Sequence, residues 1–190
     1  MINKYIFLGD SLVFGYGVQK KDSWVNLLKN NSNINIINKG INGNSTTDML
    51  FRFTEDVISQ STSMVFIMGG TNDLLLGHSV ESIINNILIM IKELKSNDIP
   101  IIIGIPPTII PEDATKLFMD FNTYDYSNTQ LPYLRDKLIA LCLNHSLDYI
   151  DFYTLTTNYK NQDIFLDGIH LNSKGQVLMY NLAKEYFKQK

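Results

Sequence analysis

Residues 64–73 are Met-Val-Phe-Ile-Met-Gly-Gly-Thr-Asn-Asp, five apolar residues that run directly into two glycines and three polar residues. A continuous apolar run, without alternation between apolar and polar positions, is typical of a strand covered on both faces in a parallel sheet. The polar residues would then lie at the carboxyl end of the strand, where open α/β sheets bind their ligands. This stretch predicts a buried parallel strand with a candidate site at its end.

Similar apolar runs recur along the chain and alternate with segments of helical periodicity. Within 80–96, for example, isoleucines and leucines recur at the spacing of a helix that packs on a sheet. The alternation predicts an α/β protein, a three-layer α/β/α sandwich with a five-stranded parallel sheet and right-handed crossovers. Residues 1–190 are expected to form one domain. The predicted strands are 5–8, 34–38, 64–68, 99–105 and 147–152, and the predicted helices are 23–30, 46–59, 80–96, 130–145 and 174–188.

Composition excludes several classes of protein. Sixteen basic residues against 19 acidic ones give a net charge of -3, which argues against a nucleic-acid binder. One cysteine cannot form an internal disulfide, and three histidines leave few ligands for a structural zinc site, so no metal or cofactor is expected. The apolar runs fall far short of the roughly 20 residues that span a bilayer, and the apolar N-terminal segment is too short for a signal-peptide core. We therefore expect a cytoplasmic protein without a membrane span.

Motif inspection removes further possibilities. Gly15-Tyr16-Gly17 begins like a dinucleotide fingerprint, but Lys20 stands where the third glycine would be. The chain has no Gly-Lys pair for a phosphate-binding Walker loop, and neither His-Glu-x-x-His nor Cys-x-x-Cys. Gly9-Asp10-Ser11 opens like a nucleophile elbow, but Val13 replaces the glycine of that motif. This departure argues against an ordinary α/β-hydrolase.

The remaining polar residues at the strand ends suit a hydrolytic serine. A serine hydroxyl needs a base to take its proton, and that base needs a third group to orient it. His170 follows Asp167 by three residues, a spacing that can set the carboxylate against one ring nitrogen while the other faces a serine. An oxyanion also needs hydrogen-bond donors, which the glycine-containing turns and the Asn72 amide could supply.

Four blocks of sequence together resemble the SGNH (GDSL) hydrolases. They are Gly-Asp-Ser-Leu with Ser11, Asn-Lys-Gly-Ile-Asn-Gly-Asn-Ser-Thr with Gly43, Gly-Gly-Thr-Asn-Asp with Asn72, and Asp-Gly-Ile-His-Leu with Asp167 and His170. The resemblance follows the family's order and extends over residues 9–172. It implies a flavodoxin-like sheet of strand order 2-1-3-4-5. It also implies that Ser11 is the nucleophile, His170 the base and Asp167 its orienting group, with the oxyanion hole formed by the Ser11 and Gly43 backbone N–H groups and the Asn72 side chain.

The expected substrate is a small-molecule ester, and three functions stay open. The first is an esterase that cleaves lipid-like acyl esters or thioesters, since the opening stretch resembles the lysophospholipase and acyl-thioesterase branch. Leu12, Leu74, Leu75 and an aromatic segment at 106–128 would suit an acyl chain. The second is a carbohydrate O-acetylesterase with a small acetyl pocket, and the third is a non-catalytic flavodoxin-like binding module. The sequence sets no oligomeric state.

Several other residues have simpler interpretations. The segment 106–128 lacks clean periodicity and is expected to be a long connection, either a wall or lid of a pocket or a surface excursion that packs its own aromatics. Asp10 is expected to hydrogen bond within its turn and His78 to be solvated near the third block. His145 is expected at a helix C-terminus, while Cys142 and Trp24 are expected in the core.

Overall fold

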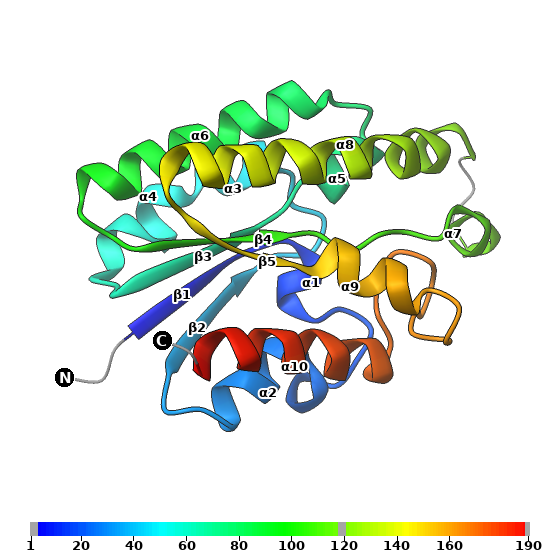
Figure 1. The fold of residues 1–190 in the computed structure, drawn as a ribbon, viewed down its shortest axis with the longest axis horizontal. Helices are drawn as coiled ribbons and strands as arrows, with labels where there is room; N and C mark the ends of the chain where they lie inside the picture. Colours follow the sequence, from blue (N-terminus) through cyan, green and yellow to red (C-terminus); the bar gives the residue numbers. More distant parts are fainter. Residues whose placement is uncertain (1–3, 118–120, 189–190) are drawn as a thin grey trace.

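Five parallel strands form one sheet in the order β2-β1-β3-β4-β5, as the family resemblance implies (Figure 1). The computed structural model describes residues 4–117 and 121–188. β3 and β4 are buried along their whole length, which is why both are continuously apolar. Each predicted strand is confirmed to within two residues at either end. The strands are β1 (Lys4–Gly9), β2 (Asn35–Gly40), β3 (Met64–Met68), β4 (Ile101–Ile105) and β5 (Asp148–Asp151).

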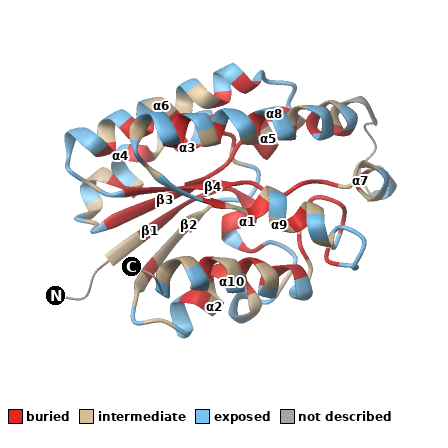
Figure 2. Cartoon of the chain, viewed as in Figure 1, coloured by how far each residue is buried: buried red, intermediate tan, exposed pale blue. Residues whose placement is uncertain are grey.

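Helices cover both faces of the sheet, so the predicted three layers are confirmed. Successive β1 side chains alternate between two cores: Ile6 and Leu8 enter one cluster and Phe7 the other. One face carries α3 (Thr46–Phe51), α4 (Phe53–Asp56), α5 (Thr71–Leu75), α6 (Val80–Ser96) and α8 (Phe121–His145) (Figure 1). The other carries α1 (Ser11–Phe14), α2 (Trp24–Asn30), α9 (Phe152–Tyr159) and α10 (Ser173–Lys188). Among the strands, β3 and β4 are buried throughout, whereas β2 at the edge of the sheet is mostly intermediate in burial (Figure 2).

The helix predictions are confirmed in existence and differ in detail. α6 begins and ends at the predicted residues. The predicted helix 46–59 is wrong as a single element, because the backbone leaves the helical region at Arg52 and separates α3 from α4. A 3₁₀ turn, η2 (Ile58–Gln60), follows α4, and another, η1 (Lys20–Asp22), precedes α2. The short helices α1, α5 and α9 were not predicted, since fewer than about three turns show no clear periodicity.

The long irregular connection expected at 106–128 is wrong for most of its length. It contains α7 (Pro111–Leu117) and the beginning of α8, while residues 118–120 lie outside the described part of the chain. Asparagine, threonine and serine are weak helix formers, so this part of the sequence hides its helix. Tertiary packing decides instead, because Tyr124 is 8% exposed and Ser127 is fully buried against the core. Within residues 4–117 and 121–188, no helix has the length and apolar character needed to cross a membrane.

Candidate active site

Ser11 lies in the turn between β1 and α1. The Asp10 side chain caps α1 by accepting a hydrogen bond from the Leu12 amide at 2.8 Å, as expected for this residue. Ser11 is therefore the first residue of a short helix at the carboxyl end of a central strand, and it is 6% exposed. The turn holds the hydroxyl at the sheet end while its own backbone is satisfied by the cap.

The structure brings Ser11, His170 and Asp167 into one hydrogen-bonded chain. His170 Nε2 lies 2.9 Å from Ser11 Oγ, and His170 Nδ1 lies 2.7 Å from Asp167 Oδ2. The other oxygen, Asp167 Oδ1, accepts from the backbone amides of Ile169 and His170 at 3.0 and 2.7 Å. Burial raises the pKa of Asp167, but the hydrogen bonds from His170 and Ile169 outweigh it and lower this pKa below its ordinary value. The carboxylate therefore stays charged beside the imidazole.

A tight loop positions Asp167 and His170. Leu166 donates its amide to the His170 carbonyl at 2.8 Å, which closes the loop at its base. Gly168 adopts φ 82°, and a Cβ at this position would lie 2.4 Å from the Ile110 carbonyl oxygen. The Ile110 amide in turn donates to the Gly168 carbonyl at 2.7 Å. A glycine is thus required both by the backbone conformation and by the close approach of the segment after β4.

Gly43 and Asn72 lie at the ends of the strands on either side of β1. Asn72 Nδ2 donates to the Asn44 carbonyl at 3.0 Å, so the third block contacts the loop that carries Gly43. An amide nitrogen has two protons, which leaves one available for a further acceptor. Gly43 adopts φ 78° with open space where a Cβ would be, so its backbone conformation, not crowding, requires glycine. All five residues predicted for the site therefore lie at one end of the sheet.

Two buried carboxylates beside this site were not assigned a catalytic role by sequence. Asp73 is fully buried and accepts from the Thr46 amide and hydroxyl at 2.8 and 2.6 Å, which ties the third block to the helix after the second. Asp10 is also fully buried, and its Oδ2 has no hydrogen-bond partner among the described residues. Burial raises the pKa of Asp10 to about 7, while the Leu12 amide and nearby His170 oppose the rise.

Tyr16 contacts the candidate base directly. Its ring centroid lies 4.4 Å from that of His170, with the two planes tilted by 44°. In the sequence, Tyr16 stands in a failed dinucleotide motif and in the opening stretch that resembles the lysophospholipase and acyl-thioesterase branch, and neither pattern predicts this contact. Its position between two glycines was the available signal, since Gly15 and Gly17 both adopt positive φ and fix the path of the chain there.

The other singled-out residues mostly have their expected surroundings. Trp24 and Cys142 are fully buried, and burial raises the pKa of the Cys142 thiol to about 12, so both core assignments are confirmed. His145 is the last residue of α8, as expected. His78 is exposed, and its Nδ1 lies 3.8 Å from Asp73 Oδ1.

The predicted acyl-chain contacts need correction. Leu12 is 4% exposed and Leu74 fully buried, so both belong to the core, and Leu75 is half-buried against it. Hydrophobicity alone does not separate a core leucine from one that faces a ligand. Other apolar side chains are exposed near the site residues instead. Those within five residues of a predicted site residue are Phe14, Tyr16, Ile41, Leu76 and Leu166, with exposures from 42% to 64%.

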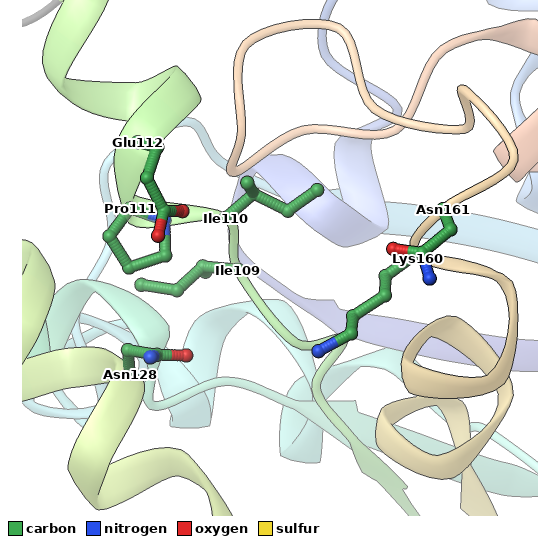
Figure 3. A pocket seen from close by; sticks show the side chains of 7 residues that line it. All are labelled: Ile109, Ile110, Pro111, Glu112, Asn128, Lys160 and Asn161. Carbon is green, nitrogen blue, oxygen red and sulfur yellow. The ribbon is translucent and has the colours of Figure 1, made fainter.

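A small pocket lies beside the loop that carries His170. It has a volume of about 230 Å³ and is bounded by the segment after β4, the N-terminal part of α8 and the residues that follow α9. Figure 3 shows the Lys160 amine pointing across it towards the side formed by Ile109 and Asn128. Of the aromatic residues in 106–128, Tyr124 and Tyr126 have described side chains, and neither lines this pocket. Tyr124 packs in the hydrophobic core and Tyr126 packs against it, with the Tyr126 hydroxyl donating to the His78 carbonyl at 3.1 Å, so these two aromatics belong neither to a lid nor to a separate surface cluster.

Comparison with known proteins agrees with this geometry. The model of the GDSL-like Lipase/Acylhydrolase family matches residues 7–178. The chain belongs to this family, as the four sequence blocks predict. The solved structure of a lipolytic protein of the G-D-S-L family from Veillonella parvula is similar, with a TM-score of 0.85, 28% identity and coverage of 98% of this chain and 99% of that one.

Two curated relatives are enzymes named for ester hydrolysis. An arylesterase of Vibrio mimicus is 30% identical over 112 residues, which are 55% of this chain and 56% of that protein. An acetylxylan esterase of Geobacillus stearothermophilus is 49% identical over 41 residues, 22% of this chain and 19% of that protein. The chain therefore matches between 19% and 56% of the length of these two relatives.

Proposed function

We propose that this protein is a serine hydrolase of carboxylic esters, with Ser11 as nucleophile, His170 as base and Asp167 as the group that orients it. The observation that carries the proposal is the chain of two hydrogen bonds, 2.9 Å from Ser11 Oγ to His170 Nε2 and 2.7 Å from His170 Nδ1 to Asp167 Oδ2. Family membership and the arylesterase relative support ester hydrolysis as the chemistry.

The reaction follows from these positions. Ser11 Oγ attacks the ester carbonyl carbon while His170 Nε2 takes its proton, and Asp167 stabilises the resulting imidazolium. The tetrahedral intermediate carries its negative charge on the former carbonyl oxygen. The Ser11 and Gly43 backbone N–H groups and the free proton of the Asn72 amide would donate to it. His170 then protonates the departing alcohol, and water, activated by the same imidazole, releases the acid from the acyl-enzyme.

Apolar acyl esters or thioesters are the proposed substrates. Every catalytic segment carries an exposed apolar neighbour: Phe14 and Tyr16 follow Ser11, and Leu166 precedes Asp167. Burying such side chains against an acyl chain is favourable by about 25 cal/mol per Å² of apolar surface. This arrangement supports a hydrocarbon acyl group more than a polar one.

A carbohydrate O-acetylesterase is the second candidate function. The pocket beside the His170 loop supports it, since Lys160, Asn128 and Asn161 offer polar groups to a hydroxylated leaving group. The acetylxylan esterase relative points in the same direction. In this case the acyl group is only an acetyl group, and the pocket would bind the alcohol part of the ester.

A fluorophosphonate probe and a series of p-nitrophenyl esters test these proposals. Wild-type protein should be labelled, whereas Ser11→Ala should resist labelling and lose hydrolysis. Failure of the wild type to react, or a Ser11→Ala variant with the parent rate, would favour the non-catalytic binding module. Rates that rise from acetate to longer chains support the acyl-ester proposal, while a sharp fall beyond acetate supports the O-acetylesterase.

A further inference from the structure

Arg52, at the break between α3 and α4, joins two of the catalytic loops with one side chain. Its Nε donates to Asn44 Oδ1 at 2.8 Å, and its Nη2 donates to the Gly9 carbonyl at 2.9 Å. The third nitrogen, Nη1, lies 2.5 Å from Asp56 Oδ2. The side chain is only 13% exposed, so these bonds are largely shielded from water.

Two of these partners, Gly9 and Asn44, lie within two residues of a proposed oxyanion donor. Gly9 ends β1 two residues before Ser11, and Asn44 directly follows Gly43. The Asn44 carbonyl accepts the Asn72 side-chain amide at 3.0 Å. One guanidinium therefore bridges the nucleophile turn and the Gly43 loop, beside the bond that the Ile41 amide donates to the Gly9 carbonyl at 3.1 Å, and through Asn44 it also reaches Asn72.

We propose that Arg52 is the positioning residue of the oxyanion hole, acting through the Gly9 carbonyl and the Asn44 side chain. The inference rests on the proposed roles of Ser11, Gly43 and Asn72. A guanidinium suits this task because its donors form a rigid planar fork, so two acceptors on different loops are held at a fixed separation. An ammonium group has the same charge but presents all its donors from a single nitrogen.

The ion pair with Asp56 gives a matched control. Asp56 also binds Lys39, at 2.6 Å through its other carboxylate oxygen, and among the described residues the Lys39 ammonium hydrogen bonds to neither Gly9 nor Asn44. Removing Lys39 therefore takes one cation from the same carboxylate and leaves the bonds to Gly9 and Asn44 in place. A Lys39 variant therefore measures how far a weaker ion pair at Asp56 lowers the stability of the fold, while Arg52 still holds both loops in place.

The experiment compares Arg52→Lys with Lys39→Met on p-nitrophenyl acetate. Loss of one oxyanion donor costs roughly 10²- to 10³-fold in kcat, and misplacement of about 1 Å costs on the order of 10²-fold. We expect Arg52→Lys to lower kcat about 10- to 100-fold, with KM and the pH profile unchanged because the His170–Asp167 pair is not touched. Lys39→Met should keep the parent kcat. An Arg52→Lys variant with the parent kcat, or equal losses in both variants, would overturn the proposal.

A second variant covers the case in which Arg52→Lys does not fold. Asn44→Ala removes the Nε acceptor but keeps the Arg52–Asp56 pair and the Asn44 carbonyl that binds Asn72. It should lower kcat with little change in KM, and a parent kcat would overturn the proposal. Ser11→Ala distinguishes failure of the proposed function from failure of the role of Arg52. If Ser11→Ala keeps activity, the proposed function is wrong. If Ser11→Ala is inactive while Arg52→Lys and Asn44→Ala keep full activity, only the role of Arg52 is wrong.

Discussion

Replacing Asp10 by asparagine should make folding stability less sensitive to pH. Asp10 is fully buried, one of its oxygens lacks a hydrogen-bond partner among the described residues, and burial raises its pKa from 3.8 to about 7. A folded-state pKa above the unfolded value means that the folded state holds the proton more tightly. The stability linked to Asp10 is therefore fully present below pH 4 and is lost as the pH rises to about 7.

The size of the effect follows from this shift. One pKa unit corresponds to about 1.4 kcal/mol, so the shift from 3.8 to about 7 amounts to ~4 kcal/mol in total. Between pH 5 and pH 8 the wild-type protein should lose about 2.5 kcal/mol through Asp10 alone. Asparagine cannot ionise, and its Oδ1 can still accept from the Leu12 amide. Between pH 5 and pH 8 the free energy of unfolding of Asp10→Asn should therefore rise by about 2.5 kcal/mol relative to that of the wild type. This change does not depend on how far the substitution itself destabilises the protein at pH 5.

Urea unfolding at several pH values measures the difference. Asp56→Asn provides a control of opposite sign: although burial raises the pKa of Asp56, Lys39 and Arg52 lower it below its ordinary value. The charge of Asp56 therefore stabilises the fold above the unfolded pKa. The free energy of unfolding of Asp56→Asn should fall relative to that of the wild type as the pH rises from 3. A difference between Asp10→Asn and wild type that stays constant from pH 5 to pH 8 would refute the reasoning for Asp10.

Two further predictions concern the candidate base. His170→Ala should lower kcat by roughly three decades or more on p-nitrophenyl acetate, since triad members act as a unit; a near-normal rate would point to His78 instead, because His145 lies beside the start of β4, at the opposite end of the sheet. Tyr16→Ala should lower kcat/KM about two- to twelvefold, because an aromatic pair contributes about 0.5–1.5 kcal/mol, whereas Tyr16→Phe keeps the ring beside His170 and should match the wild type. Equal losses in both Tyr16 variants would assign the effect to the hydroxyl.

The parts of the fold that the sequence predicted are those in which local pattern and tertiary role agree. β3 is apolar along its length because it is buried on both faces, and α6 shows its stripe because only one side packs on the sheet. At the start of α8 the local sequence pattern and the tertiary role disagree. Tyr124 and Ser127 pack inward from a segment of weak helix formers, so only the folded chain shows why it is helical.

For the candidate site, the sequence predicted the proposed catalytic residues but not the side chains that hold them in position. Serine, histidine and aspartate at fixed spacings have a chemical meaning that a sequence displays. Arg52 contacts Gly9 from 43 positions away, and a lone arginine in a predicted helix looks like any solvated residue. The wrong assignment of Leu12 and Leu74 has a related cause, since exposure depends on neighbours that are distant in sequence.

The hydrogen bond between Ser11 and His170 joins residues 159 positions apart. During synthesis the turn of the proposed nucleophile and both loops proposed for the oxyanion hole leave the ribosome long before the loop that carries the proposed base. The nascent chain therefore holds a serine with no group to activate it until residues 163–172 have docked beside β1. Hydrolytic activity would then appear only after the C-terminal part of the chain has folded. C-terminal truncations that remove residues 163–172 should leave Ser11 unreactive even where the sheet still forms.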